Sequence, residues 1–342
     1  MATCRMTDAI ARAEQRLHWT RRALDTPALE LRPASADASF RSYWRGWRDG
    51  GGSVIVMDAP PEHEDIRPWL DVDARLCRAG LAAPRVLAAD PESGFIAMQD
   101  LGDRTYLPEL DAASVDILYA DALDALLRMQ RDVDAQGLPR YDEPHLVAEM
   151  ELLPRWFLER HLGVRPDCGT REVLEIAFRQ LVNAALAQPV AFVHRDFHSR
   201  NLLVLDADGP GIIDFQDAVL GPLTYDLVSL LRDCYIVWPE TRVERWALDH
   251  RLRLIDAGLL PVHVGPQAFL RSFDLMGLQR HLKVLGIFCR LWYRDGKRGY
   301  LADLPRVYAY AMDVARRYPE LAPLAALLER AVADRDLTAP AP

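Results

Sequence analysis

The chain has 342 residues, of which 50% are hydrophobic, and its 41 Lys and Arg against 50 Asp and Glu give a formal charge of -9. That length allows one large domain or two lobes with separate cores. The acidic balance argues against nucleic acid as a partner, because binding a phosphate backbone requires a basic surface. The N-terminus lacks an apolar signal segment and no stretch approaches about 18 consecutive apolar residues, so we expect a cytoplasmic protein without a membrane partner.

The cysteines are scattered along the chain and form no C-x-x-C pair. We therefore expect neither a disulfide framework nor a zinc site, but thiols in a reducing compartment. No feature of the chain indicates an obligate protein partner. The five cysteines are Cys4, Cys77, Cys168, Cys234 and Cys289.

The first hundred residues are predicted to form a small β-rich lobe. Apolar residues at helical spacing predict a helix over 3–24. Residues 40–57 combine β-branched and aromatic side chains around a glycine-rich turn, which predicts a β-hairpin. The lobe is completed by a helix that ends at Gly80 and by short strands at 86–89 and 95–99.

After Gly102 the pattern becomes mainly helical, and the only strand-like segments are 191–193, 202–205 and 211–213. We therefore predict an α+β fold with two lobes. The predicted helices are 112–131, 144–161, 171–187, 240–257, 267–294, 304–317 and 320–334. The predicted division is a nucleotide-binding lobe at 1–100, a hinge near 99–104, a helical catalytic and substrate lobe at 105–335 and a flexible tail at 336–342.

One segment carries a specific chemical motif. His194, Asp196 and Asn201 form the pattern H-R-D-x-x-x-x-N between two short apolar strands, and Asp214-Phe215 follows at the end of the second strand. This arrangement is typical of the catalytic loop and the metal-binding loop of the kinase fold. The alternative is an ordinary surface loop, but composition alone would produce the match with a probability on the order of 10⁻³.

Phosphoryl transfer explains why these residue types occur at this spacing. Asp196 is predicted to be the catalytic base, which accepts the proton of the attacking hydroxyl and aligns that group with the γ-phosphorus of ATP. Asn201 and Asp214 offer an amide oxygen and a carboxylate, which are hard ligands suited to Mg²⁺. The sequence therefore predicts a kinase with ATP as co-substrate and Mg²⁺ as cofactor.

His198 extends the motif to H-x-D-x-H-x-x-N, which resembles the aminoglycoside and choline phosphotransferase family rather than the protein kinases. The resemblance covers roughly residues 35–295 and implies a bilobal, protein-kinase-like fold. Asp-Phe-Gln stands where protein kinases have Asp-Phe-Gly. Asp226 resembles the structural aspartate that caps a helix and hydrogen-bonds the catalytic loop, and the alternative for it is a third metal ligand.

Two histidines accompany Asp196 in the motif. A loop histidine beside a catalytic aspartate most often bonds the backbone and holds the loop in shape, which is the role expected of His194. His198 is the better candidate for a direct catalytic role near the metal or the phosphate. Arg200 and Asp217, within and just after the motif, are expected to contact the substrate.

Three further segments give a closer resemblance. They are S-A-D-A-S-F-R-S-Y-W-R, V-I-V-M-D-A-P-P-E and the helical L-x-R-H-L-K-V-L-G-I-F-C-R-L. With the catalytic segment, they resemble the kinases of peptidoglycan recycling that act on N-acetylmuramate and N-acetylglucosamine. This resemblance implies that ATP phosphorylates the anomeric C1 hydroxyl of the amino sugar, giving the α-1-phosphate and ADP on a route of cell-wall recycling.

The predicted nucleotide-binding lobe departs from the usual kinase pattern at its first hairpin. No glycine precedes Gly46, so a glycine-rich phosphate loop is missing. Ser39 and the backbone amides of Phe40 and Arg41 are therefore predicted to cover the phosphates.

The second departure concerns the strand lysine that orients the ATP phosphates in protein kinases. Met57 occupies its place, and no lysine precedes Lys283. We expect either the metals alone or an arginine, Arg41 or Arg45, to supply the missing charge. Glu64 is the acidic residue best placed to approach that arginine.

The segment Met98-Gln99-Asp100-Leu101-Gly102 resembles the family's connector between the two lobes. Adenine is expected there, bonded to the backbone groups of Gln99 and Leu101. Core packing is an equally good explanation for Met98 and Leu101.

Basic residues gather between 271 and 298, where the acidic chain reverses its charge locally. Their helical spacing puts several on one face, which is ordinarily a solvated surface. The functional alternative is that Arg280, Lys283 and Arg290 face the substrate and bind the lactyl carboxylate that distinguishes N-acetylmuramate from N-acetylglucosamine.

Two other functions are consistent with the sequence. The chain could phosphorylate another small hydroxyl compound, such as an aminoglycoside or an amino alcohol, whose cationic character would require an acidic pocket. It could also be an inactive nucleotide-binding kinase-fold module, which the missing lysine suggests. The complete set of Asp196, Asn201 and Asp214 argues against the inactive module.

Overall fold

The computed structural model describes residues 2–36, 40–48, 50–206 and 209–340. The chain divides into two compact units. The N-terminal unit comprises Met1–Thr105 together with Leu202–Asp217, and the C-terminal unit comprises Tyr106–Asn201 together with Ala218–Pro342. Membership of residues 202–217 in the N-terminal unit was not among the expectations from the sequence.

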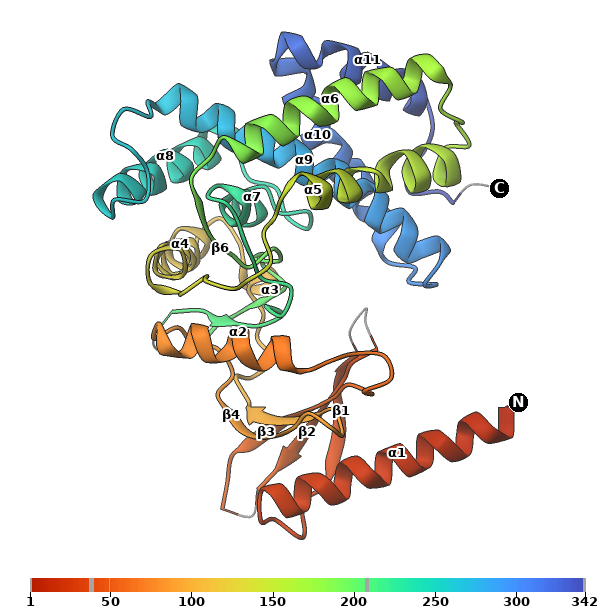
Figure 1. Ribbon diagram of the computed structural model, residues 1–342, viewed down its shortest axis with the longest axis vertical. Coiled ribbons are helices and arrows are strands. Elements are labelled where there is room, and N and C mark those ends of the chain that lie inside the picture. Colours follow the sequence, from red (N-terminus) through yellow and green to blue (C-terminus); the bar gives the residue numbers. More distant parts are fainter. Residues whose placement is uncertain (1, 37–39, 49, 207–208, 341–342) are drawn as a thin grey trace. The chain divides into compact units, whose positions relative to one another are not determined.

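An antiparallel five-stranded sheet forms the centre of the N-terminal unit, with the strand order β1-β2-β3-β5-β4 (Figure 1). β2 (Ser42–Trp47) pairs with β3 (Ser53–Asp58) from Ser42 opposite Asp58 to Trp47 opposite Ser53, which confirms the predicted hairpin. The strand β1 was not expected from the sequence. The other strands of this sheet are β1 (Leu31–Ala36), β4 (Val86–Asp90) and β5 (Phe95–Gln99).

The long N-terminal helix α1 (Ala2–Ala23) is attached to this sheet by both apolar and ionic contacts. The ring of Trp19 lies 5.4 Å from that of Phe95, within a buried cluster of sheet residues. Arg16 Nη1 lies 2.7 Å from Oδ2 of Asp58, a buried carboxylate at the end of β3. The helix predicted from apolar spacing is therefore present and holds the sheet from one side.

Residues 202–217 join the N-terminal unit through a short β-hairpin. The N–H of Ile212 donates to the carbonyl of Ala82 at 2.9 Å, and the N–H of Val204 donates to that of Arg104 at 2.8 Å. These bonds attach the hairpin to segments that lie a hundred or more residues earlier in the chain. The hairpin consists of β7 (Leu202–Leu203) and β8 (Gly211–Ile212), and Ala82 follows the helix α2 (Arg67–Arg78).

The C-terminal unit is built around α9 (Pro266–Tyr293), whose side chains are buried almost without interruption from Phe273 to Gly286. Among the described residues, no helix combines the length and the apolar character needed to cross a bilayer. The helices that pack against α9 include α5 (Glu143–Met150), η1 (Leu153–His161), α6 (Cys168–Leu186), α7 (Tyr225–Leu231), α8 (Glu240–Asp256) and α10 (Leu304–Arg317). The remaining helical elements of the unit are α3 (Tyr106–Glu109), α4 (Val115–Asp132), η2 (Tyr300–Asp303), η3 (Pro319–Leu321) and α11 (Ala322–Val332).

Three features of the C-terminal unit differ from the sequence-based expectations. The helix predicted over 144–161 is divided into α5 and the π-helix η1, and Pro154 lies at the start of η1, where its missing N–H interrupts a continuous ladder. The strand β9 (Val219–Pro222) pairs antiparallel with β6 (Val190–Val193) although no strand was expected there. The helix α7 was not among the helices predicted from apolar spacing, although the family resemblance at Asp226 implied a helix there.

A neighbouring backbone approaches α9 closely at Gly286. A Cβ at this position would lie 2.4 Å from the carbonyl carbon of Leu152, at the junction of α5 and η1. At Gly277, two and a half turns earlier, the nearest atom to such a Cβ would be Val228 Cγ1 at 3.4 Å, an ordinary contact. Of the two glycines of α9, only Gly286 lies where packing leaves no room for a Cβ.

We predict that Gly286→Ala lowers the free energy of unfolding by roughly 1–3 kcal/mol, because the added methyl group forces the two backbones apart. Gly277→Ala is the matched control and should leave stability unchanged or raise it by up to about 1 kcal/mol, since Ala favours the helix. Urea unfolding followed by circular dichroism measures both variants. Equal stabilities for the two would contradict the packing argument.

Candidate active site

The motif residues from His194 to Asn201 form a loop that follows β6 in the C-terminal unit. Arg195 has a φ of 76°, a left-handed conformation that costs energy for a residue with a Cβ. Asp226 in the first turn of α7 compensates, because its carboxylate accepts the N–H of His194 at 2.6 Å and that of Arg195 at 3.0 Å. The bonding role expected of Asp226 is confirmed, although its side chain caps the loop and forms no cap bond at the start of α7.

A second buried aspartate holds the other end of the loop. Oδ2 of Asp233 accepts the N–H of Ser199 at 2.9 Å and the Ser199 hydroxyl at 2.5 Å. His194 holds the middle, since its Nδ1 accepts the N–H of Asp196 at 3.3 Å. His194 is fully buried, so the structural role expected of it agrees with its surroundings.

Asp196 lies in the part of the loop that remains open, and 39% of its side chain is exposed. Arg280 Nη2 lies 3.9 Å from Asp196 Oδ1 and brings a buried positive charge close to it. Burial raises the pKa of Asp196, but the positive charges of Lys283 and Arg280 outweigh burial and lower it to about 2. Asp196 is therefore an ionised carboxylate at neutral pH and can accept hydrogen bonds.

The cations Arg280 and Lys283 are held inside the C-terminal unit by other protein groups. Arg280 Nη1 donates to the carbonyl of Arg195 at 2.8 Å, and Lys283 Nζ lies 2.8 Å from Oε1 of Glu149. Both also donate to the Tyr225 hydroxyl, at 3.2 and 3.1 Å. Burial raises the pKa of Glu149, but Lys283 and Arg195 more than offset this and keep it below its usual value.

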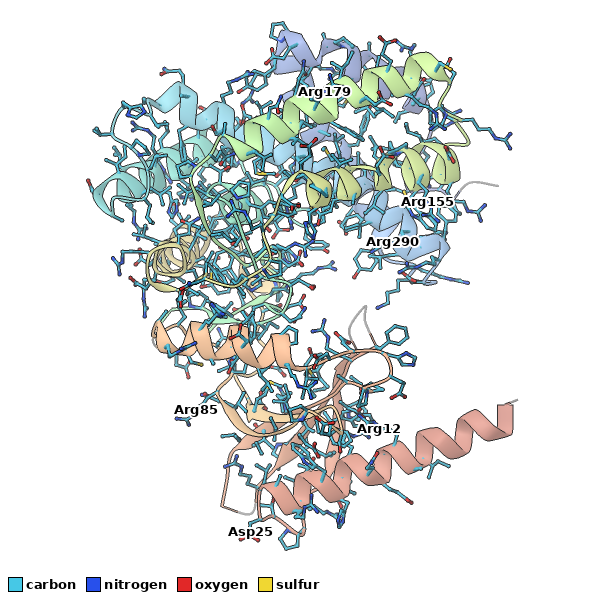
Figure 2. All side chains as sticks on the ribbon, viewed as in Figure 1. Arg12, Asp25, Arg85, Arg155, Arg179 and Arg290 are labelled. Atoms are coloured by element: carbon cyan, nitrogen blue, oxygen red, sulfur yellow. The ribbon has the colours of Figure 1, made fainter. Side chains whose placement is uncertain are left out.

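The basic residues of α9 were expected to form a solvated face, but this network shows that two of them, Arg280 and Lys283, are buried. Arg280 is 3% exposed and Lys283 is 6% exposed, and both have partners within the chain. Arg290, two turns after Lys283 on α9, is half-buried, and its Nε is buried without a hydrogen-bond partner among the described residues (Figure 2). Contact of these three residues with substrate stays a prediction.

His198 and Arg200 both contact Tyr235. The His198 ring meets that of Tyr235 edge-on at 5.5 Å, and its Nδ1 is buried without a hydrogen-bond partner in the described part of the chain. Burial lowers the pKa of His198 in spite of the nearby Asp233 and Asp196, so the imidazole is neutral at physiological pH. Arg200 is exposed, and its guanidinium carbon lies 3.6 Å from the centre of the Tyr235 ring.

In the N-terminal unit, Arg41 forms an ion pair with Glu64. Met57 is fully buried in β3, while Arg41 Nε lies 3.2 Å from Glu64 Oε1 and Arg41 Nη2 lies 4.0 Å from Asp214 Oδ1. Arg45, the alternative cation, instead pairs with Asp100 through its Nε at 2.6 Å. The pairing expected between Arg41 and Glu64 is thus present.

The other predicted nucleotide-binding residues are distributed around the same sheet. Phe40 is exposed and stacks on His63 with ring centres 4.4 Å apart, whereas Ser39 lies outside the described residues. Gln99 ends β5, and its N–H donates to the carbonyl of Arg85 at 2.9 Å. Leu101 packs against Gly211 of β8.

The two predicted metal ligands have side chains suited to Mg²⁺. Asp214 has a φ of 65°, and Gln216 Nε2 donates to its Oδ1 at 3.0 Å, while Asp217 is exposed three residues further on. The side-chain amide of Asn201 is oriented through its Nδ2, which donates to the carbonyl of Asp196 at 3.0 Å. Among the described residues, three or more His, Cys, Asp or Glu nowhere gather as a metal cluster. One carboxylate and one amide oxygen nevertheless match the way proteins bind Mg²⁺, which keeps water and phosphate oxygens as its other ligands.

Sequence analysis missed Glu149, Tyr225 and Asp233, which the structure brings to the catalytic loop. Each belongs to a helix or turn far from the motif, with no spacing that relates it to Asp196. Two of them offered a local signal: Tyr225 adjoins Asp226, and Asp233 lies seven residues after Asp226 in a stretch whose only other charged residue is Arg232.

A small antiparallel-sheet unit and a mainly helical unit with an H-R-D loop define the kinase-like fold, and the chain is a phosphotransferase with a hydroxyl acceptor. Residues 30–259 match the phosphotransferase enzyme family, and the chain belongs to this family. It is 48% identical to the N-acetylmuramate/N-acetylglucosamine kinase of Pseudomonas aeruginosa and 46% identical to that of Pseudomonas putida, with 89% of each chain covered in both comparisons. In fold it resembles the Plasmodium vivax ethanolamine kinase, with a TM-score of 0.62 and 11% identity over 86% of each chain.

Proposed function

We propose that this protein is an ATP- and Mg²⁺-dependent sugar kinase that phosphorylates the anomeric C1 hydroxyl of N-acetylmuramate and N-acetylglucosamine. The choice of substrate is supported by the two Pseudomonas relatives, which carry these sugars in their names and are 46% and 48% identical to this chain. The chemistry is supported above all by Asp196, an ionised and partly exposed carboxylate on a loop held by two buried aspartates.

In this proposal Asp196 orients the sugar hydroxyl and accepts its proton while the hydroxyl oxygen bonds to the γ-phosphorus of ATP and the bond to ADP breaks. The low pKa of Asp196 keeps it ready to accept a hydrogen bond from the hydroxyl throughout the neutral range. His198 is the neutral imidazole beside this carboxylate. Arg200 and Asp217 are proposed to bind the sugar.

The nucleotide is proposed to bind through Arg41, which Glu64 holds in place of the missing lysine pair. An arginine can fulfil this role because its guanidinium remains charged when buried and presents several donors to phosphate oxygens. Asn201 and Asp214 are the proposed Mg²⁺ ligands, and the ion would neutralise negative charge on the phosphates. Phe40 with Ser39 at the phosphates and Gln99 with Leu101 at the adenine complete the proposed contacts.

The test of the function is the substrate itself. We expect the purified protein with Mg²⁺ and ATP to phosphorylate N-acetylmuramate and N-acetylglucosamine, and ³¹P NMR to identify the product as an α-1-phosphate. Choline and kanamycin are the comparison substrates, because they represent the cationic acceptors of other members of the fold. Phosphorylation of choline or kanamycin with neither amino sugar consumed would refute the proposal.

Substitutions of the proposed base and of the proposed nucleotide ligands should affect different quantities, kcat in the first case and Mg·ATP binding in the second. Asp196→Asn is expected to bind Mg·ATP as the wild type does but to lose roughly 10²- to 10⁴-fold in kcat, the usual contribution of general-base catalysis. Asp214→Ala and Arg41→Gln should instead weaken Mg·ATP binding, and Asn201→Ala should weaken it less. Isothermal titration and steady-state kinetics measure the two quantities. Wild-type turnover in Asp196→Asn, or unchanged binding in Asp214→Ala, would remove that residue from its assigned role.

Arg290 is the proposed partner of the lactyl carboxylate. Arg280 and Lys283 donate to protein groups, whereas Arg290 forms no side-chain hydrogen bond or ion pair among the described residues and lies seven residues, about 10 Å, beyond Lys283 on the same helix face. A guanidinium can hold a carboxylate through two parallel hydrogen bonds. N-acetylglucosamine lacks this group and so should not depend on Arg290.

We therefore predict that Arg290→Gln lowers kcat/KM for N-acetylmuramate about ten- to a hundredfold more than for N-acetylglucosamine, the value of one charge-assisted hydrogen bond of ~1.5–3 kcal/mol. Arg294→Gln is the matched control, because Arg294 lies one turn further and pairs with Asp295 through its Nε at 2.7 Å. Kinetics on both sugars measure the effect. Equal losses on the two sugars in Arg290→Gln would place the carboxylate elsewhere.

A further inference from the structure

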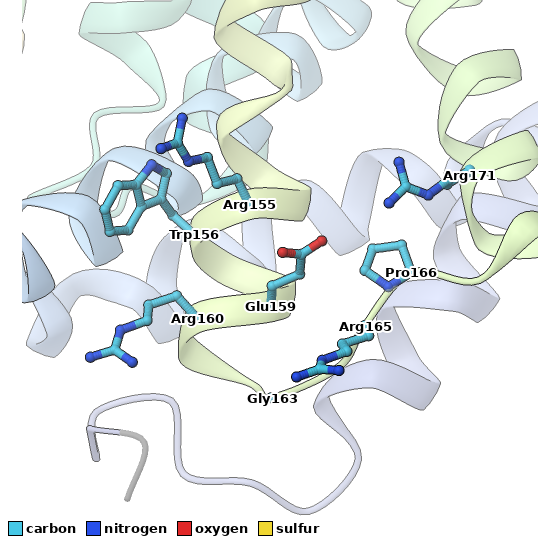
Figure 3. Close-up of a pocket in the computed structure, with 8 residues that line it drawn as sticks. All are labelled: Arg155, Trp156, Glu159, Arg160, Gly163, Arg165, Pro166 and Arg171. Atoms are coloured by element: carbon cyan, nitrogen blue, oxygen red, sulfur yellow. The ribbon is translucent and has the colours of Figure 1, made fainter.

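A cavity of about 670 Å³ opens on the C-terminal unit where the π-helix η1 turns toward the start of α6 (Figure 3). Four arginines line this cavity, and Glu159 is the only acidic side chain among the lining residues. Figure 3 shows the Trp156 ring between two of the arginines and Arg171 reaching toward Glu159 from α6. The arginines are Arg155, Arg160, Arg165 and Arg171.

The four guanidinium groups are not neutralised by the chain. Within the described ranges, none of them takes part in an ion pair or a side-chain hydrogen bond, and all four residues are exposed. Several other arginines of the same unit are paired with carboxylates: Arg232 lies 2.7 Å from Glu240, and Arg242 lies 2.6 Å from Asp116. In a chain with a formal charge of -9, four unpaired arginines around one hollow indicate a site for an anion.

The cavity also has features that an inorganic anion would not use. An adjoining cavity of about 320 Å³ shares Arg155 and Arg171 with it and adds the carboxylates of Glu151 and Glu175. A ligand that spans both would place negative groups among the arginines and hydroxyl donors against the carboxylates. Trp156 contributes an aromatic ring at the basic end, where a planar or sugar ring can stack.

Within the C-terminal unit, this place lies away from the catalytic loop, although Arg290, the proposed partner of the lactyl carboxylate, is only three residues before Tyr293 on α9. The guanidinium of Arg160 lies 4.8 Å above the ring of Tyr293, at the C-terminal end of α9. Lys283, which belongs to the charge network of the catalytic loop, lies ten residues earlier on that helix, about 15 Å along its axis. Binding at the cavity therefore does not require displacement of any residue placed at the catalytic loop.

We propose that the arginine-lined cavity binds an organic phosphate that carries a hydroxylated ring, either a nucleotide or a sugar phosphate. The arginines bind its phosphate groups, the carboxylates of the adjoining cavity accept its hydroxyls, and Trp156 stacks on its ring. The proposal goes beyond the kinase reaction and does not depend on which sugar the enzyme phosphorylates.

Isothermal titration of the protein saturated with Mg²⁺, a non-hydrolysable ATP analogue and N-acetylmuramate tests the site, since the nucleotide site and the whole sugar site, Arg290 included, are then occupied. The probes are cytidine diphosphate, glucose 1-phosphate and inorganic phosphate. We expect one of the two organic phosphates to bind at one site per chain. Binding should fall at least tenfold in Arg155→Gln/Arg171→Gln and in Arg165→Gln. Arg179→Gln, an exposed position on α6 outside the cavity (Figure 2), is the matched control and should bind as the wild type does.

The probes also distinguish the two sources of such a ligand, because Trp156→Ala should weaken a stacked nucleotide base more than a sugar phosphate. Wild-type kcat in all variants shows that they are folded. Unchanged binding in both cavity variants overturns the proposal, as does the absence of binding by either organic phosphate. If inorganic phosphate binds as tightly as the organic phosphates, the ring contributes nothing to binding, and the proposal of an organic ligand is wrong. Binding of a polyglutamate peptide that is lost in the cavity variants, with no organic phosphate bound, would assign the cavity to an acidic protein segment instead.

Discussion

Two cations of one buried helix, Arg280 and Lys283, lie in the interior of the C-terminal unit, and the catalytic loop is arranged around their charge. An unpaired buried cation costs several kcal/mol, so the unit can fold only with Glu149 and the carbonyl of Arg195 in contact with them. These contacts place positive charge beside Asp196 and keep its pKa low. The reactivity of the proposed base thus follows from the way the unit neutralises α9.

Charge compensation also explains the loop's backbone. Arg195 adopts a left-handed conformation, which persists only where its surroundings stabilise it. Asp226 accepts two successive N–H groups there, and Asp233 accepts two hydrogen bonds from Ser199. The loop is therefore held by carboxylates at both ends, while Asp196 between them stays accessible.

The N-terminal unit also pairs a buried cation with a carboxylate, but it uses different residues. Its buried strand position holds Met57, and the cation that faces a carboxylate is Arg41, which pairs with Glu64. Arg41 comes from the segment before β2, so the cation reaches Glu64 from a different strand position than a lysine at residue 57 would. The missing lysine alone therefore does not indicate an inactive kinase fold.

Much of this protein could be predicted from local sequence patterns. The 3.6-residue period predicted α9 to within one residue at each end, and the order of the motif residues predicted a kinase loop, because both signals lie within short segments. These patterns missed the strand β9 and the helix α7. β9 contains Gly and Pro and is a strand only because β6 pairs with it, and α7 is buried on all sides and so has no amphipathic period.

By itself, then, the sequence determined the two-part α+β organisation, the kinase motif and the presence of a basic stripe on one long helix. Only the tertiary structure decided that Arg280 and Lys283 of this stripe turn inward to Glu149 and Tyr225, that Arg41 rather than Arg45 pairs with Glu64, and that residues 202–217 fold with the N-terminal strands. The physical reason is that helical spacing fixes which residues share a face. The residues that contact that face come from segments distant in the chain, and no local sequence pattern predicts which residues they are.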